Sequence, residues 1–309
     1  MGTGSDDNLL TLRSRILRTG EYKLIERIGV GGMSEVWKAW DIAGQRLVAI
    51  KILGEKFAEN GEDVRHFRVE EKMLEEIHHP GIVAAYDFDY GNGRWYMVME
   101  YVDGYTFADL LRRKGAVPET DCLLICESVA RALNHIWNDH GIVHCDIKPE
   151  NIMINTEGVV KLMDLGVSHR FQALGDRVKP LDCVLGTPAY ISPEQVYGDV
   201  ELDCRTDIYS LGATLYHLST GRTLFTGLDT DAMMCAQCDE SKQAEDPRME
   251  NPWLSEGFVQ MLEAMLVKDR DYRVASWSYV YEMCMDVEKK MRFKPRTDGA
   301  VSSIRLLEG

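Results

Sequence analysis

Residues 143–151 read VHCDIKPEN and place a carboxylate at Asp146, an ammonium group at Lys148 and an amide at Asn151. Pro149 stands among them, and proline disfavours the interior of a helix because it lacks a backbone N–H. Apolar residues flank the stretch on both sides. These features predict a loop between two buried segments, on which three polar side chains converge.

The composition predicts a globular protein with a substantial core. The chain has 309 residues, 45% of them hydrophobic, which is enough for one large or two ordinary domains. No stretch approaches the roughly 18 consecutive apolar residues of a transmembrane segment, and no secretory leader is recognisable. The eight cysteines are therefore expected to be free thiols in the cytoplasm. The net charge of -15 argues against nucleic-acid partners, because neutralising phosphates requires clustered lysine and arginine.

The hydrophobic pattern changes character once along the chain. Short strand-like runs separated by turn signals fill residues 22–102, with one helical stretch among them. From about Thr106 onward, apolar residues recur every three or four positions, which predicts helices. The expected strands are 22–29, 35–41, 46–53, 81–88 and 94–102, and the expected helices are 61–78, 106–114, 118–138, 207–221, 258–266 and 278–291.

This change predicts an α+β fold with two lobes. The first is a small antiparallel β-sheet lobe with one main helix, and the second is larger and mostly α-helical. The expected boundaries are an N-terminal extension at 1–20, the sheet lobe at 21–102, the helical lobe at 103–292 and a C-terminal tail at 293–309.

A glycine cluster lies between the first two expected strands, in IGVGGMSEVW at 28–37. Glycine lets the backbone turn tightly and approach an anion with its N–H groups unobstructed, so the cluster is a candidate phosphate cradle. An ordinary glycine-rich hairpin remains the alternative for this motif alone, because such clusters recur by chance.

A lysine lies inside the apolar strand LVAIKIL at 47–53. If Lys51 is buried, its ammonium group needs a carboxylate partner, and Glu70 on the following helical stretch is the natural candidate. The alternative is an edge strand from which Lys51 points into water.

A further carboxylate follows a strand-like run in KLMDLG at 161–166. Asp164 stands just before a glycine-containing turn, where its oxygen atoms could serve a ligand. Taken alone, an aspartate in this position is more typical of an ordinary turn.

Together, and in this order, these motifs resemble the protein kinase family, and closely the bacterial eukaryotic-like serine/threonine kinases. The resemblance covers about residues 21–290 and implies the bilobal kinase fold. The matching motifs are GVGGMSEVWKAWD (29–41), VAIK (48–51), HHPGIV (78–83), VMEYVDG (98–104), HCDIKPEN (144–151), DLG (164–166), GTPAYISPE (186–194), DIYSLG (207–212) and Arg273.

The resemblance implies an enzyme that transfers the γ-phosphate of ATP to protein hydroxyl groups. Asp146 would orient the substrate hydroxyl and accept its proton, and Lys148 would steady the γ-phosphate. Asn151 and Asp164 would be the metal ligands, with Mg²⁺ as the expected metal and Mn²⁺ as an alternative.

The resemblance also implies an ATP site in the sheet lobe and its hinge. Lys51, held by Glu70, would contact the α- and β-phosphates. Glycines of the first hairpin would cover the phosphates, and the hinge backbone would bind adenine. The expected ATP-binding residues are Ile28, Gly29, Gly31, Gly32, Val36, Ala49, Lys51, Glu70, Met99, Glu100, Val102 and Met153.

Two features imply how substrate proteins are selected and how the segment beside them is anchored. In this family, a lysine at the position of Lys148 with Thr187 opposite it accompanies serine or threonine acceptors. Glu194 resembles the carboxylate that pairs with Arg273 and anchors the activation segment, the stretch from Asp164 to Glu194. Asp207 resembles the residue that supports the catalytic loop, the motif at 144–151.

One departure from the family pattern affects regulation. Cys145 occupies the position where the family usually has an arginine that binds a phosphate on the activation segment. Ser168 is the only hydroxyl residue between Gly166 and Gly186. We therefore expect activity that does not depend on phosphorylation of this segment. A separate regulatory partner is expected for another reason, because no transmembrane sensor is recognisable in the sequence.

Two other functions are alternatives to kinase activity. A nucleotide-binding pseudokinase or scaffold would use the fold without phosphotransfer, but the complete set of catalytic residues argues against it. A small-molecule phosphotransferase would not need GTPAYISPE at 186–194, which the family uses to bind peptides.

Overall fold

The computed structural model describes residues 21–58, 61–91, 93–165, 169–170, 186–198 and 202–292. Within them the chain forms two compact units. We call residues 21–78 and 83–103 the sheet unit, and residues 79–82 and 104–292 the helical unit. The expected N-terminal extension and C-terminal tail lie outside the described residues.

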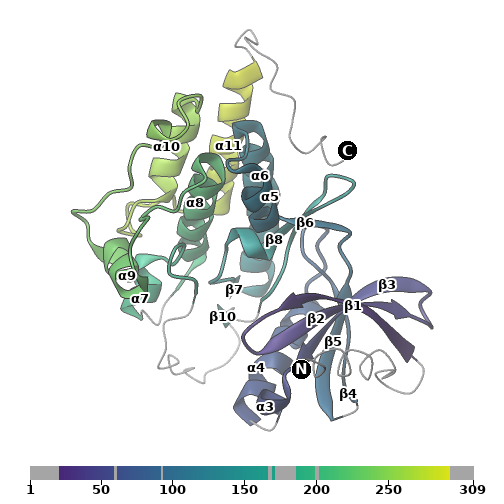
Figure 1. Cartoon of the computed structure of the whole chain (residues 1–309). Coiled ribbons are helices and arrows are strands. Elements are labelled where there is room, and N and C mark those ends of the chain that lie inside the picture. Colours follow the sequence, from purple (N-terminus) through teal and green to yellow (C-terminus); the bar gives the residue numbers. More distant parts are fainter. Residues whose placement is uncertain are drawn as a thin grey trace, which may run out of the picture. The chain divides into compact units, whose positions relative to one another are not determined.

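The sheet unit is built on a five-stranded antiparallel sheet with the order β1-β2-β3-β5-β4 (Figure 1). The strands are β1 (Tyr22–Val30), β2 (Ser34–Asp41), β3 (Arg46–Leu53), β4 (Ala85–Gly91) and β5 (Arg94–Glu100), and the helices are α3 (Glu55–Ala58) and α4 (Gly61–Glu76). Trp37 pairs in register with Ile50, and both belong to a buried cluster with Val48 and Tyr96. Apolar residues at alternate positions thus fill one side of the sheet.

The helix α4 supplies the second layer of the sheet unit. Phe67, Met73 and Leu74 are buried at helical spacing, and the Phe67 ring lies 5.6 Å from the ring of Phe88 on β4. Glu70 projects among these apolar residues and is only 4% exposed. Such burial is costly for a carboxylate without a partner.

The helical unit is organised around α8 (Cys204–Thr220), whose residues are almost all buried. The long helix α6 (Glu119–His140) and α10 (Glu256–Met265) pack against α8, and α11 (Trp277–Arg292) packs against α6 (Figure 1). The remaining helices are α5 (Phe107–Lys114), α7 (Pro193–Tyr197) and α9 (Thr230–Cys238), with 3₁₀ turns η1 (Pro149–Asn151) and η2 (Pro247–Met249).

Short strands complete the helical unit. Strands β6 (Gly104–Thr106), β8 (Ile152–Asn155) and β9 (Val160–Leu162) form a three-stranded sheet, and β7 (Ile142–Val143) pairs with β10 (His169–Arg170). The predicted loop therefore does lie between buried strands β7 and β8. Its last residues form the turn η1, which sequence reasoning did not predict, because proline is favourable at the first position of a helical turn.

The α+β fold class is confirmed, but one expected strand is wrong in position. The predicted run at 81–88 becomes β4 only from Ala85 onward. Gly81 and Ile82 belong instead to the helical unit, where the Leu162 N–H donates to the Gly81 carbonyl at 2.8 Å and Ile82 forms a parallel bridge with Leu162. Hydrogen bonding to β9 replaces sheet pairing there.

Across the described part of the chain, no helix is both long enough and apolar enough to cross a membrane.

Candidate active site

Asp146 lies at the centre of a polar network in the helical unit. Its Oδ2 lies 2.6 Å from Lys148 Nζ and accepts a 3.1 Å hydrogen bond from the Asn151 amide. Its Oδ1 accepts the Thr187 hydroxyl at 2.8 Å, and Lys148 Nζ donates to Thr187 Oγ1 at 2.8 Å. The three side chains of the loop motif therefore meet, and Thr187 joins them from a distant part of the chain.

The backbone just before Asp146 is held in a conformation that most residues avoid. Cys145 has a φ of 68°, in the left-handed region where a non-glycine residue is strained. The carboxylate of Asp207, in α8, accepts the N–H groups of His144 at 2.7 Å and of Cys145 at 2.8 Å. Burial raises the pKa of Asp207 to about 6. The structure places Asp207 where the resemblance implied, below the catalytic loop.

His144 joins this loop to the segment that carries Asp164. Its Nδ1 accepts the Asp146 N–H at 3.3 Å, and its Nε2 lies 3.1 Å from the Met163 carbonyl oxygen. A carbonyl oxygen can only accept, so the two contacts together require the neutral tautomer with the proton on Nε2. This fully buried ring therefore fixes the spacing between the two segments.

The hairpin of β8 and β9 brings Asn151 and Asp164 to one end of a small sheet. Ile152 pairs with Leu162, and the Met163 N–H donates to the Asn151 carbonyl at 2.9 Å. Asp164 follows with a φ of 61°, again a strained value for aspartate. Carboxylate and amide oxygens at such a place suit a hard divalent cation.

In the sheet unit, Lys51 and Glu70 form the predicted ion pair. Lys51 Nζ donates to both carboxylate oxygens of Glu70, at 2.7 and 2.8 Å. β3 lies in the middle of the sheet and the two side chains are 14% and 4% exposed, so the edge-strand alternative is wrong. The pairing offsets the cost of burying the two charges.

One face of the same sheet collects further residues that the resemblance assigned to ATP. Val36 is paired in register with Gly29 on β1 and with Lys51 on β3, and Ala49 is paired with Met99 on β5. Paired residues, and residues two apart on one strand, project to the same face of a sheet. These five residues therefore share one face.

The turn between β1 and β2 leaves room for a ligand to approach the backbone. The Gly31 N–H donates to the Ser34 carbonyl at 2.8 Å and closes the turn. A Cβ atom added at Gly32 would meet nothing within 4 Å. Ile28, near the end of β1, is 48% exposed. These glycines are among the residues that keep a negative φ, so the turn does not need them for a left-handed backbone.

Three residues that were expected to contact adenine are not among the five on this face of the sheet. Glu100 ends β5, where its N–H donates to the Ala84 carbonyl at 2.9 Å. Val102 is buried two residues later. Met153 lies on β8 in the helical unit, in register with Lys161. Their contact with adenine stays a prediction.

A buried ion pair anchors α7, as the resemblance implied. Arg273 donates to both carboxylate oxygens of Glu194, at 2.7 and 3.0 Å, and the side chains are 0% and 4% exposed. Burial acts to raise the pKa of Glu194, but the hydrogen bonds and charge of Arg273 outweigh it and leave that pKa below its usual value.

Sequence reasoning missed two glutamines of this region. Gln195, in α7, donates to the Cys145 carbonyl at 2.8 Å. Gln237, in α9, accepts the Tyr209 hydroxyl at 2.5 Å and donates to the carbonyls of Pro188 and Ala189 at 3.2 and 3.3 Å. The Ser-x-x-Gln spacing of a capping box signals the helix that carries Gln195, whereas nothing local indicates Gln237. The prediction about Ser168 falls outside the described residues.

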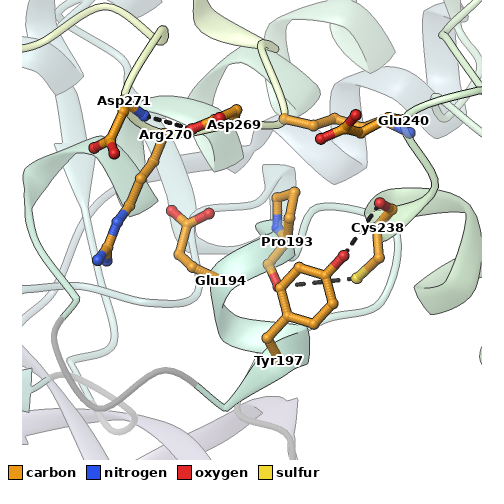
Figure 2. A pocket seen from close by; sticks show the side chains of 9 residues that line it. Pro193, Glu194, Tyr197, Cys238, Glu240, Asp269, Arg270 and Asp271 are labelled. Atoms are coloured by element: carbon orange, nitrogen blue, oxygen red, sulfur yellow. Dashed lines mark hydrogen bonds between the residues drawn. The ribbon is translucent and has the colours of Figure 1, made fainter.

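A separate cavity of about 240 Å³ lies beside α7, and Figure 2 shows the side chains that line it. Glu194 and Tyr197 line it from α7, and the Tyr197 hydroxyl donates to the Cys238 carbonyl at 3.3 Å. Asp269–Asp271 close another side, with the Asp271 N–H bonded to Asp269 at 2.9 Å. Neither Asp146 nor Asn151 lines this cavity, so it is not the place of the predicted chemistry.

Comparison with known proteins agrees with these features. Residues 22–285 match the sequence model of the protein kinase domain. The chain is 40% identical over 210 residues to the serine/threonine-protein kinase PknB of Mycolicibacterium smegmatis, covering 67% of this chain and 33% of that protein. It is 36% identical over 271 residues to a probable PknB of Bifidobacterium longum, covering 85% and 39%.

Serine/threonine-protein kinase PrkC of Bacillus subtilis is 33% identical over 276 residues, covering 89% of this chain and 40% of that protein. The chain thus spans between a third and two fifths of the length of these relatives. Because the family match takes in most of the sequence and both described units, the chain belongs to the protein kinase domain family.

Proposed function

We propose that this chain is an ATP-dependent serine/threonine protein kinase. The observation that carries the proposal is the network at Asp146, in which Lys148, Asn151 and Thr187 all contact one carboxylate. A positioned carboxylate can orient a hydroxyl group and accept its proton, a contribution of about 10²–10⁴ in rate. The proteins named as serine/threonine kinases among the relatives support the same acceptor class.

In the proposed reaction, the substrate hydroxyl oxygen attacks the γ-phosphorus of ATP and the bond to the β-phosphate breaks, releasing ADP. Asp146 takes the proton of the hydroxyl. The ammonium group of Lys148 lies beside the Asp146 carboxylate, and therefore near the hydroxyl group that reacts. From there Lys148 stabilises the charge that develops on the transferred phosphoryl group. Thr187 bridges these two side chains and so holds the lysine in place.

ATP would contact the sheet unit through the face that carries Lys51. The ammonium group of Lys51, held by Glu70, would bind the α- and β-phosphates, and the open turn at Gly31 and Gly32 would cover them. Asn151 and Asp164 would hold Mg²⁺, or Mn²⁺ as an alternative. The metal neutralises phosphate charge when bound, and the oxygen donors present suit it.

We also propose that activity does not require a phosphorylated activation segment. Cys145 is 1% exposed and packs in an apolar cluster with Val143 and Leu202. A buried thiol cannot bind a phosphate as an arginine does. A separate partner as the source of the regulatory signal is part of the same proposal.

The reducing cytoplasm is the compartment that we propose for this protein. The support comes from the cysteines, because all seven that lie in the described residues are free thiols.

The test is transfer of radiolabelled γ-phosphate from ATP to a generic basic protein. We expect incorporation on serine and threonine, and a loss of about 10²–10⁴ in kcat for the Asp146→Asn variant. Incorporation that is equal in the two proteins would show that Asp146 is not the catalytic carboxylate. No incorporation by the wild-type protein would favour a pseudokinase, and turnover on small alcohols or sugars alone would favour a small-molecule phosphotransferase.

A further inference from the structure

The residue that precedes Asp146 is held through both of its backbone polar groups. The Cys145 N–H donates to Asp207 Oδ1 at 2.8 Å, and the Cys145 carbonyl accepts from Gln195 Nε2 at 2.8 Å. The thiol side chain is buried beside Val143 and Leu202. These contacts surround Cys145, whose φ is 68°. A strained backbone conformation of this kind persists only where the surrounding contacts leave no alternative conformation.

The orientation of the Gln195 amide is fixed by its other contacts. Gln195 Oε1 accepts the Ser192 N–H at 3.2 Å and the Ser192 hydroxyl at 3.1 Å. A backbone N–H can only donate and the Cys145 carbonyl can only accept, so the amide cannot be reversed without losing both contacts. Gln195 is 5% exposed, which leaves little water to replace a lost bond.

The start of the described segment at Gly186 packs against the same hydrogen bond. A Cβ atom at Gly186 would lie 3.1 Å from the Cys145 carbonyl oxygen and 3.2 Å from Gln195 Nε2. Gly186 also has a φ of 119°, which other residues rarely adopt. The segment from 186 to 195 therefore closes on the Cys145 carbonyl at both of its ends.

We propose that Gln195 is a positioning residue for Asp146. Its uncharged amide ties α7 to the carbonyl of Cys145, and so holds the catalytic loop and the segment that carries Thr187 in one fixed arrangement. This link needs no phosphate and no positive charge at position 145. The proposal rests on the proposed kinase function and gives the structural basis for activity without activation-segment phosphorylation.

Two variants test the hydrogen bond itself. Gln195→Met has a similar length but neither donor nor acceptor, and we expect kcat to fall about tenfold with the KM for ATP unchanged. Gln195→Glu can donate to the Cys145 carbonyl only when its carboxyl group is protonated. Its kcat, relative to wild type, should therefore rise as the pH falls from 8 towards 6, while that of Gln195→Met stays constant. Gln260→Glu, at an exposed position on α10, is the matched control and should follow wild type.

A second measurement does not depend on activity. The Cys145 thiol is buried, so a short pulse of N-ethylmaleimide should label it slowly in wild type and about tenfold faster in Gln195→Met. Mass spectrometry would read the labelling of each cysteine. Cys204, buried in α8, reports global opening and should label at the same rate in both proteins.

The proposal is wrong if Gln195→Met keeps wild-type kcat and wild-type protection of Cys145. It is also wrong if the relative activity of Gln195→Glu does not change with pH. A wild-type protein without phosphotransfer would refute the proposed function alone, because the labelling of Cys145 would still decide whether Gln195 holds the loop.

Discussion

Replacing Glu194 with glutamine should destabilise the helical unit strongly, because it leaves the Arg273 guanidinium buried without a counter-charge. Arg273 is 0% exposed and donates to both oxygens of Glu194. It also donates to the carbonyls of Val267, Lys268 and Arg205. Those bonds would remain in Glu194→Gln, but the glutamine NH₂ group would face one arm of the guanidinium.

The magnitude follows from the burial of both partners. Two charges about 4 Å apart at an effective dielectric constant of about 20 attract each other by about 4 kcal/mol. Removing one partner of a buried pair typically costs about 3–5 kcal/mol. We expect this loss for Glu194→Gln and for Arg273→Met, and a smaller loss for the double variant than for the sum of the two, because the double variant buries no unpaired charge.

Urea and thermal unfolding would measure these losses. A cost of about 3–5 kcal/mol corresponds to a fall in Tm of about 6–20 °C in a unit of this size. The pKa of Glu194 lies below its ordinary value of 4.5. Its ionised form therefore stabilises the fold above that pH, and the contribution is lost as the pH falls through the lowered pKa.

The wild-type and Glu194→Gln stabilities should accordingly converge in acid. A loss below about 1 kcal/mol at neutral pH, or single losses that simply add in the double variant, would refute the argument from burial.

Two other predictions concern the catalytic machinery. Glu70→Gln removes the charge that holds Lys51, so kcat/KM for ATP should fall about 10–100-fold. Steady-state kinetics at saturating peptide measure this change, and a wild-type value of kcat/KM would contradict the prediction. Asp207 has its pKa raised to about 6 by burial, so its contribution to stability is fully present below about pH 4 and is lost as the pH rises through 6. The difference in unfolding free energy between wild type and Asp207→Asn should therefore shift by about 3 kcal/mol between pH 4 and 7, and parallel pH–stability curves would argue against that burial effect.

Local patterns predicted much of the fold. Alternation of apolar residues located β1, β2 and β3, and helical spacing located α6 and α8, because these periods depend only on which face of an element is buried. The segment 79–82 could not be predicted in the same way. Its pairing with β9 depends on where the chain passes after more than seventy further residues, and its own apolar pattern equally suits a strand of the larger sheet.

In the candidate site, too, contacts within a short stretch were predictable and contacts between distant segments mostly were not. The loop motif predicted that Asp146, Lys148 and Asn151 would meet, since they lie on one short stretch around a proline. The partner of Lys51 was also predictable, because a buried ammonium group requires a carboxylate. The roles of Gln195 and Gln237 were not predictable, because glutamines are mostly exposed and the hydrogen-bond partners of these two are distant in sequence.

The sequence by itself determined which chemical groups this protein has and the order in which they occur, because charge, hydrogen-bonding capacity and period belong to single residues or short stretches. Only the tertiary structure decided how the catalytic loop is held. Cys145 has a φ of 68°, its N–H donates to Asp207, and its carbonyl accepts from Gln195. A strained peptide is stable only when contacts from several elements act on it together. Those contacts exist only once α7 and α8 have packed around the loop.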